Sequence, residues 1–250
     1  YCLRHCGVGS NDVWSAPEGS RLTPETPLTL TLTTGDGLEI TRTVSVDADY
    51  MFTISDEVRN TSAEPRALRP FGVVRRDGLP EDYVTQAVVH QGFVGAFGDE
   101  NIRLQSTTYK QAQDHVKKRT RGRVGEDERI RESNSNGGWF GISDHYWLTA
   151  IIVDQSERMH AYYDARGGAG EIDYRAAYQG SWREVPAGGA ITYTQRLFAG
   201  AKEYEELTNY TEKLGIPYLD YSIDWGWFWF IAIPFQKLLL WLFDLFKNFG

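Results

Sequence analysis

Strict alternation of apolar and polar residues is the feature that most constrains how this chain can fold. Residues 28–33 read Leu-Thr-Leu-Thr-Leu-Thr, and residues 38–46 alternate in a similar way. A period of two puts the apolar side chains on one face of a strand. Between the two runs, residues 34–37 read Thr-Gly-Asp-Gly, which is the composition of a tight turn. Residues 28–46 therefore predict a β-hairpin.

Further strand candidates follow at short intervals, separated by polar and glycine-rich turns. They are residues 50–58, 68–74, 92–97, 102–109, 138–153, 159–163, 172–178 and 191–199. Strands and helices do not alternate along this region as they do in parallel sheets. The pattern predicts a mainly β fold, with residues 26–200 forming a large antiparallel β-sandwich.

Two segments depart from the strand pattern. Residues 111–137 are highly charged and poor in apolar residues, so we expect a solvated loop that is the least ordered interior segment. Residues 202–214 carry apolar side chains three and four positions apart, which predicts a helix ended by Gly215 and Pro217. The chain then divides into an N-terminal segment 1–25, the sandwich 26–200, a helix and linker 201–218, and a C-terminal segment 219–250.

The charge balance and the cysteines argue against nucleic-acid and metal binding. The chain has 26 Lys and Arg against 34 Asp and Glu, a net charge of −8, whereas nucleic-acid-binding domains are usually basic. Cys2 and Cys6 with His5 could form a local disulfide or part of a metal site. A metal site needs more ligands at suitable spacing. We interpret the two cysteines as incidental thiols and expect neither a metal nor a nucleic-acid partner.

No catalytic motif is apparent in the sequence. It lacks a GxSxG nucleophile turn, a Walker loop, a GxGxxG motif after a strand, and an HExxH zinc motif. His145 lies beside Asp144 in a strand candidate, where neighbouring side chains point to opposite faces, so Asp144 is poorly placed to orient it. We interpret His145 and His160 as structural, and predict a protein that is not an enzyme and needs no cofactor. Acid–base catalysis would have to use His145 with a carboxylate such as Glu171.

The C-terminal segment differs in kind from the rest of the chain. Residues 225–235 are almost wholly apolar and rich in tryptophan, and residues 235–249 place their large apolar side chains on one helical face. Pro234, Lys237 and Asp244 interrupt the run, whereas a membrane-spanning helix needs about 20 nearly uncharged residues. A helix buried in the core or between chains is a further alternative, although the segment is unusually apolar for one.

An interfacial position fits this segment best. Tryptophan favours the lipid headgroup level, and an amphipathic helix with lysine on its polar face lies in the plane of the membrane. We expect the helix to begin near Pro234, because proline suits a first helical turn. The residues expected to contact the membrane are Trp225, Trp227, Trp229, Phe230, Phe235, Leu238, Leu239, Trp241, Leu242, Leu245, Phe246 and Phe249.

Two stretches match a known family pattern. Residues 137–142 read Gly-Gly-Trp-Phe-Gly-Ile and are followed at residues 146–150 by Tyr-Trp-Leu-Thr-Ala. Residues 224–231 read Asp-Trp-Gly-Trp-Phe-Trp-Phe-Ile, with a proline at position 234. These residues resemble the YidC/Oxa/Alb membrane protein insertases, specifically the Gram-negative YidC branch, where a stretch of the form D-[YW]-G-W-[FL]-W-F-I-x-x-P precedes the second transmembrane helix. The strand region agrees more loosely, and residues 1–20 match poorly.

The resemblance implies a fold and a place in a larger protein. The fold is a large twisted β-sandwich of the galactose-mutarotase-like supersandwich type, followed by an amphipathic helix on the periplasmic face of the inner membrane of a Gram-negative bacterium. The abrupt ends of the chain agree with a piece of a longer protein, in which one transmembrane helix precedes this domain and five follow. In the family, a hydrophilic groove of that transmembrane core receives the incoming protein without any cofactor.

The resemblance also implies the function and its partners. The domain would be an accessory, partner-docking part of an insertase that helps integrate and fold inner-membrane proteins, alone or with the Sec translocon. Its partners would be the lipid bilayer surface, accessory subunits of the Sec translocon and, through the transmembrane core, nascent membrane proteins. The alternative is a sugar-binding or aldose-epimerase-like β-sandwich protein.

Overall fold

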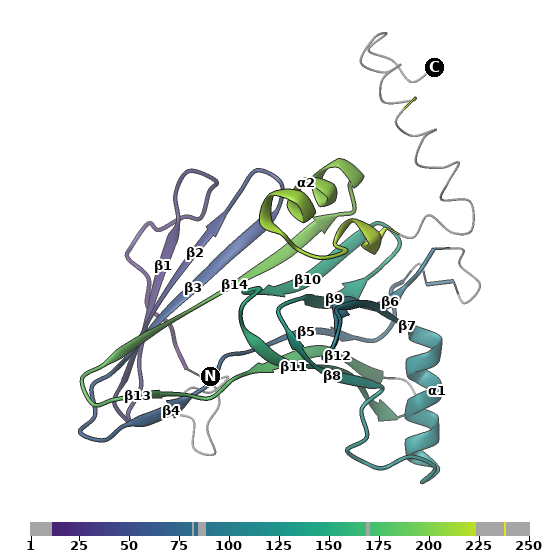
Figure 1. Ribbon diagram of the computed structural model, residues 1–250, viewed down its shortest axis with the longest axis horizontal. Helices are drawn as coiled ribbons and strands as arrows, with labels where there is room; N and C mark the ends of the chain where they lie inside the picture. Colours follow the sequence, from purple (N-terminus) through teal and green to yellow (C-terminus); the bar gives the residue numbers. More distant parts are fainter. Residues whose placement is uncertain (1–11, 82, 85–88, 169–170, 224–237, 239–250) are drawn as a thin grey trace.

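The computed structural model describes residues 12–81, 83–84, 89–168, 171–223 and 238 (Figure 1). Antiparallel strands make up about half of this part of the chain, in an eight-stranded sheet, a four-stranded sheet and a small two-stranded sheet. The eight strands of the large sheet lie in the order β1-β2-β3-β14-β10-β9-β6-β7. Their bounds are β1 Leu28–Thr33, β2 Leu38–Val46, β3 Met51–Asn60, β14 Ala190–Ala201, β10 Trp147–Val153, β9 Trp139–Ser143, β6 Gly92–Phe97 and β7 Arg103–Thr108.

The four-stranded sheet has the order β5-β12-β11-β8, and β13 pairs with β4. The bounds of these strands are β5 Phe71–Asp77, β12 Glu171–Gly180, β11 Arg158–Gly168, β8 Arg131–Asn136, β13 Arg183–Val185 and β4 Arg66–Leu68. β5 and β12 pack against β9 and β10, so the small sheet covers one half of the large one. Phe140 and Ile151 of the large sheet meet Tyr163 and Tyr174 of the small sheet in the core between them. The predicted mainly β antiparallel sandwich is confirmed.

The predicted strands are found with small changes of boundary. The hairpin predicted at residues 28–46 is found as β1 paired with β2, with Leu30 opposite Arg42 across the ladder. The candidate strand 68–74 is divided into β4 and β5 at Pro70, which has no N–H to donate to a ladder. The candidate strand 138–153 is a hairpin of β9 and β10. These differences leave the layers of the sandwich unchanged.

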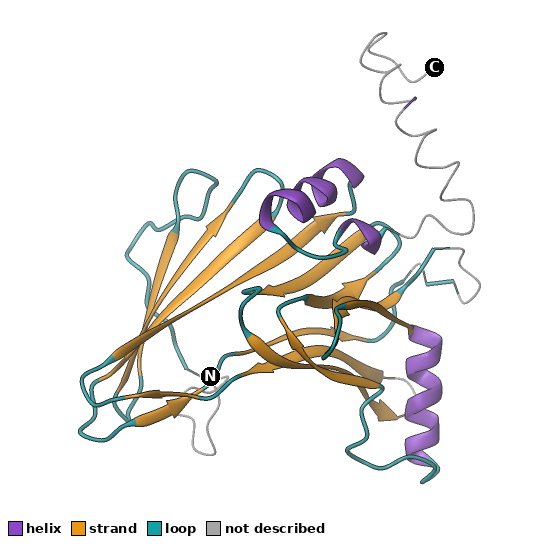
Figure 2. Ribbon diagram, in the orientation of Figure 1, coloured by secondary structure: helices purple, strands orange, loops and turns teal. Residues whose placement is uncertain are grey.

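The prediction of a solvated loop at residues 111–137 is wrong. Helix α1 (Tyr109–Thr120) runs into this region and begins with a capping box, in which the Thr108 hydroxyl accepts from the Gln111 N–H and the Gln111 side chain accepts from the Thr108 N–H. β8 ends the region as an edge strand paired with β11. Only Tyr109, Ala112 and Val116 of the helix are buried, so the apolar stripe is narrow and starts before the charged stretch. Figure 2 shows α1 standing beside the sheets at one edge of the molecule.

The predicted helix at residues 202–214 is found as α2 (Tyr204–Leu214), followed by the short 3₁₀ helix η1 (Asp220–Ser222). Gly215 ends α2 with φ of +64°, the left-handed conformation expected of a glycine C-cap. α2 and η1 lie across one end of the large sheet, whereas β13 and β4 lie toward the opposite end (Figure 2). The half of the large sheet that contains β9 and β10 is therefore covered on both faces.

Candidate functional site

The chain leaves the sandwich through a compact unit that we call the α2 platform, residues 204–223. Leu207 of α2 is fully buried, and so are Ile216 and Leu219 in the turns that follow. They share an apolar cluster with Leu148 of β10 and Phe198 of β14. Because three separate points of the platform are buried, residues 204–223 are held firmly against the large sheet.

Trp139 of the Gly-Gly-Trp motif fastens the platform to the sheet. Its ring is fully buried, and its indole N–H donates to the carbonyl oxygen of Pro217 at 2.8 Å. The glycines around it are required by close backbone contact. A Cβ on Gly138 would lie 2.2 Å from the Ala96 carbonyl oxygen, and one on Gly141 would lie 2.0 Å from that of Thr149. The motif therefore supplies a buried aromatic anchor in a sheet too tight for side chains at these two positions.

A second fastening joins α2 to the turn between β2 and β3. The Tyr210 hydroxyl donates to Asp47 Oδ2 at 2.6 Å, and Asp47 Oδ1 accepts the backbone N–H groups of Asp49 and Met51. Burial, followed by the hydrogen bond and charge of Asp47, raises the pKa of Tyr210 above its ordinary value. The hydroxyl therefore stays protonated and remains a donor to this carboxylate.

The same end of the molecule is acidic. Glu206 of α2 faces Glu203, Asp49 and Asp47, and one of its carboxylate oxygens is buried without a hydrogen bond. Burial raises the pKa of Glu206 first, and the three neighbouring carboxylates raise it further. A surface of this charge attracts anions poorly.

The membrane-contacting residues predicted from sequence lie almost entirely outside the described residues. Leu238 is the exception; it is helical and about half exposed. No helix in the described part of the chain is both long and apolar enough to cross a membrane. The residues outside it are Trp225, Trp227, Trp229, Phe230, Phe235, Leu239, Trp241, Leu242, Leu245, Phe246 and Phe249.

A cleft of about 540 Å³ opens between β3 and β14 of the large sheet and β5 and β12 of the small one. Two ion pairs lie in its wall. Arg42 makes a bidentate bridge to the buried Asp56, with N–O distances of 2.7 and 2.8 Å. Arg183 forms a second ion pair, with Glu157. The Trp14 ring lies over the Arg42 guanidinium, whose central carbon is 4.8 Å from the ring centroid. The cleft is polar and presents planar groups, and four of its charged side chains are held in these two ion pairs within the fold.

The structure does not bring together the residues nominated for acid–base catalysis. His145 lies in the turn between β9 and β10, not in a strand, and it is not among the residues that line the cleft. The Asp144 carboxylate accepts the Tyr109 hydroxyl and pairs with Arg76. Glu171 lines a separate hollow at the start of β12. Among the described residues, no three His, Cys, Asp or Glu side chains are grouped so that they could hold a metal ion.

Comparison with known families identifies the domain. A family model described as the YidC periplasmic domain matches residues 6–238. The chain belongs to the YidC periplasmic domain family. Curated YidC relatives are named membrane protein insertase YidC. The protein of Rhizobium johnstonii is 38% identical over 242 residues, and that of Methylobacterium sp. (strain 4-46) is 41% identical over 244 residues. Each match covers 97% of this chain and 38% of the relative, so the chain spans well under half of their length.

A solved structure gives a weaker likeness to this YidC periplasmic domain. It is a galactose mutarotase-like protein from Lactobacillus casei ATCC 334, with a TM-score of 0.40 and 9% identity, covering 75% of this chain and 73% of that one. A likeness of this size carries no argument about ligand or chemistry. The family resemblance read from the Gly-Gly-Trp and tryptophan-rich stretches is confirmed by the family match.

Some contacts of this site could not be predicted from the sequence. Asp47 looks like an ordinary turn residue, and nothing in its surroundings predicts a bond to Tyr210 across 163 positions. The Arg42–Asp56 bridge joins neighbouring strands at registered positions, which a correct hairpin register could have suggested. Trp139 was found only as part of a motif, and its contact with Pro217 depends on how the turns after α2 fold.

Proposed function

We propose that this domain is the periplasmic accessory and partner-docking part of a membrane protein insertase, tied to the membrane surface by residues 225–249. The observation that carries the proposal is the match of residues 6–238 to the YidC periplasmic domain, because the relatives that share it are named as insertases. The whole protein would integrate and fold inner-membrane proteins, alone or with the Sec translocon. The domain would lie on the periplasmic side of the inner membrane of a Gram-negative bacterium.

The α2 platform supports a mechanical role for the C-terminal segment. The last residue described before that segment, Ile223, packs against the cluster that includes Leu207 and Leu219. An amphipathic segment that starts from a rigid base holds the whole sandwich at a limited distance from whatever surface it binds. The domain would then offer its surfaces to partners close to the membrane, with accessory subunits of the Sec translocon and nascent chains as the expected ones.

Flotation with liposomes tests the membrane role. Replacing Leu239 or Leu242 by Asp puts a charge on the expected lipid-facing stripe, which costs several kcal/mol, so flotation should be almost abolished. Asn248→Asp is the matched control, because it adds the same charge on the polar face of the segment. Removing Lys237 or Lys247 should weaken binding by only about 1 kcal/mol on anionic lipid.

The result that would contradict the proposal is equal flotation of the wild-type chain and both leucine variants. If a charge on the apolar stripe leaves vesicle binding unchanged, that stripe is not inserted into lipid. Packing of the segment on the domain, or between two chains, would then be the better account. Failure of the wild-type chain itself to float would have the same meaning.

The cleft gives the sugar-binding alternative one supporting observation. Trp14, Tyr178 and Tyr193 line it together with charged groups, and sugar sites use aromatic faces with polar groups around them. Titration of neutral aldoses into the chain tests this alternative. Saturable binding that Trp14→Ala removes would favour a sugar-binding module, and no heat or fluorescence change would dismiss it.

A further inference from the structure

Exposed aromatic residues lie at the end of the large sheet that leads into the α2 platform. They come from the β2–β3 turn, from the β9–β10 turn together with the first residue of β10, and from the residues after α2, and we call them the aromatic rim: Tyr50, Tyr146, Trp147, Tyr218 and Tyr221. Backbone hydrogen bonds bring the first two segments to the same end of the large sheet. Tyr50 accepts a hydrogen bond from the Ala199 N–H, Tyr146 accepts one from the Lys202 N–H, and both donors are at the end of β14 that leads into α2. Tyr218 and Tyr221 stack edge to face at 5.8 Å.

Two residues of the rim are held in an unfavourable backbone conformation. Tyr50 has φ of +68° and Tyr218 has φ of +59°, and within the described residues they are the only non-glycine residues with positive φ. This left-handed region suits glycine or asparagine, whereas a bulky residue there is an outlier. The Tyr50 ring lies over Gly200 of β14, and both rings are still about half exposed, so each presents a large part of its surface to solvent. Strain retained at two exposed tyrosines on the same end of the molecule indicates that the rings themselves have a use.

We propose that the aromatic rim is a second membrane contact, in which these rings rest among the lipid headgroups beside the C-terminal segment. The inference rests on the proposed membrane role of residues 225–249 and extends it to the sandwich itself. Tyrosine and tryptophan combine an apolar ring with a hydrogen-bonding group, and they are the residues enriched at the headgroup level. The chain runs from the rim directly into residues 224–250, whose composition predicts an interfacial segment.

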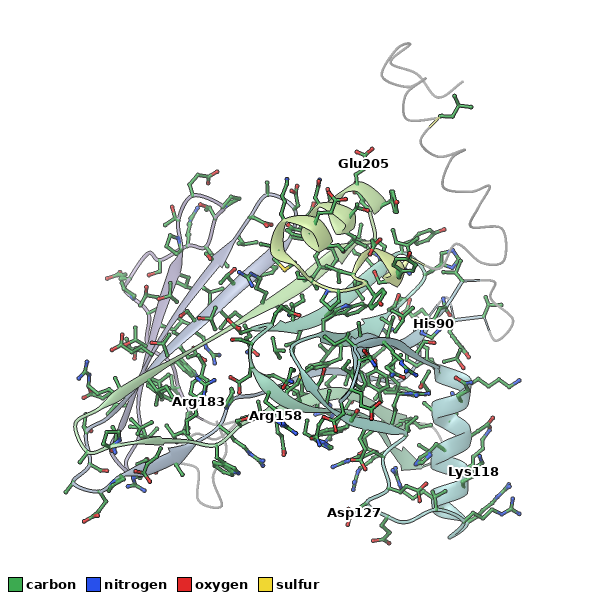
Figure 3. The ribbon with its side chains drawn as sticks, in the orientation of Figure 1. His90, Lys118, Asp127, Arg158, Arg183 and Glu205 are labelled. Carbon is green, nitrogen blue, oxygen red and sulfur yellow. The ribbon has the colours of Figure 1, made fainter. Side chains whose placement is uncertain are left out.

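The charge around the rim specifies which lipid surface would be preferred. Asp49, Glu203 and Glu205 are exposed at this end, and Figure 3 shows Glu205 pointing outward from α2. A surface with these carboxylates is repelled by anionic headgroups. The rim therefore fits a zwitterionic headgroup layer, and raising the share of anionic lipid should weaken its contribution, opposite to the effect expected for Lys237 and Lys247.

Quenching of tryptophan fluorescence by lipid tests the contact directly. The full chain is mixed with phosphatidylcholine vesicles whose acyl chains are brominated near the headgroup. Trp147 is 61% exposed at the rim, and Trp182 is 50% exposed just before β13, which lies toward the other end of the molecule. Trp147→Phe should remove a component of the emission that the vesicles quench. Trp182→Phe, the matched control, should remove a component that they leave unquenched.

The strained tyrosines give an independent measurement. Tyr50→Asn and Tyr218→Asn keep a residue that tolerates the left-handed backbone but remove the ring. Each should lower the partition coefficient for phosphatidylcholine vesicles about three- to tenfold, while Trp182→Asn leaves it unchanged. Urea midpoints measured alongside establish that all three variants are folded.

The outcomes separate this inference from the proposed function. If Trp147 is unquenched and the tyrosine variants partition like the wild type while the remaining tryptophans are quenched, the rim contact is refuted and the membrane role of residues 225–249 stands. Contact of the aromatic rim with a protein partner would then be the better account. If no emission is quenched and the wild-type chain does not bind vesicles, both ideas fail together.

Discussion

Asp164 of β11 is the centre of the charge network that keeps α1 attached to the sandwich. Its side chain is 2% exposed and accepts from Arg119 of α1, Arg129 of the following loop and Arg166 of its own strand. Arg119 is itself 12% exposed and donates to the backbone oxygens of Glu128 and Ala165 as well. Asp164→Asn keeps the shape of the side chain but removes the negative charge that all three guanidinium groups contact.

The size of the effect follows from burial. Removing one partner of a buried ion pair costs about 3–5 kcal/mol. Arg166 and Arg129 are partly exposed, so water compensates them in part and the lower end of that range, about 3 kcal/mol, applies. For a chain of this size the urea dependence is about 3 kcal/mol per molar, so the urea midpoint should fall by about 1 M.

The control is Asp114→Asn, which removes an exposed partner of Lys117 on the same helix. It should cost less than about 0.5 kcal/mol. The pH dependence gives a further check. Burial alone would raise the pKa of Asp164, but hydrogen bonds and charges from Arg166, Arg129 and Arg119 outweigh it and leave the pKa lowered. The stabilisation by Asp164 is therefore present above the unfolded-state pKa of about 3.9 and is lost as the pH falls through the lowered folded-state value. An Asp164→Asn midpoint within about 0.3 M of the wild type at pH 7 would refute the argument.

Two further substitutions test the α2 end. Glu206→Gln should raise the free energy of unfolding by about 0.5 kcal/mol at pH 7, because it removes like-charge repulsion. The raised pKa of Glu206 means that its carboxylate destabilises the fold only when ionised, so the gain should disappear by about pH 3, and urea titrations at both pH values will reveal a gain of the wrong sign. Gly141→Ala should cost about 3 kcal/mol, because the new Cβ would lie 2.7 Å from Ala150 Cα as well as against the Thr149 carbonyl. Gly35→Ala, where a Cβ meets nothing within 4 Å, is its control in thermal unfolding, and equal midpoints for the two variants would contradict the packing argument.

Alternation in sequence predicted the sandwich well because most strands bury one face. β2 has the bounds expected from its pattern, with Leu38 and Ile40 buried between exposed neighbours. β6 was found for a different reason: all of its residues are buried, and a short apolar run between turns reads as an interior strand. In both cases the residues of the strand itself predict the strand, and pairing with neighbouring strands agrees with that prediction.

The signal fails where tertiary contacts replace local pattern. β8 reads Arg-Glu-Ser-Asn-Ser-Asn and has no large apolar side chain; it is a strand because β11 pairs with it, and Ser135 is buried beneath that edge. α1 depends on Asp164, which lies 45 positions from Arg119 in the chain. A charged stretch therefore looks solvated in sequence whenever its counter-charge lies in another element.

Some features of the candidate site can be predicted from neighbouring residues in the sequence, and others depend on contacts between distant residues. The tryptophan-rich segment and the Gly-Gly-Trp motif are local, so both were recognisable as family features before any fold was known. The left-handed backbone of Tyr50 and Tyr218 is not, because a tyrosine in a turn has no sequence mark that distinguishes it from any exposed ring. The two tyrosines can be assigned a common role only because the fold places both at the end of the sandwich from which the C-terminal segment continues.

For the aromatic rim and the C-terminal segment to contact the membrane together, the α2 platform must be rigidly attached to the sandwich. A flexible tether would let the sandwich tumble, and rings on its body would then meet lipid only transiently. Trp139 and Tyr210 instead fix the platform to the sheet, so the rim and Ile223, the last described residue of the platform, belong to one packed unit. If both contacts exist, each raises the effective concentration of the other at the membrane. Loosening the platform with Tyr210→Phe, which removes the hydrogen bond to Asp47, should then weaken vesicle binding even though Tyr210 itself is buried and does not reach the lipid.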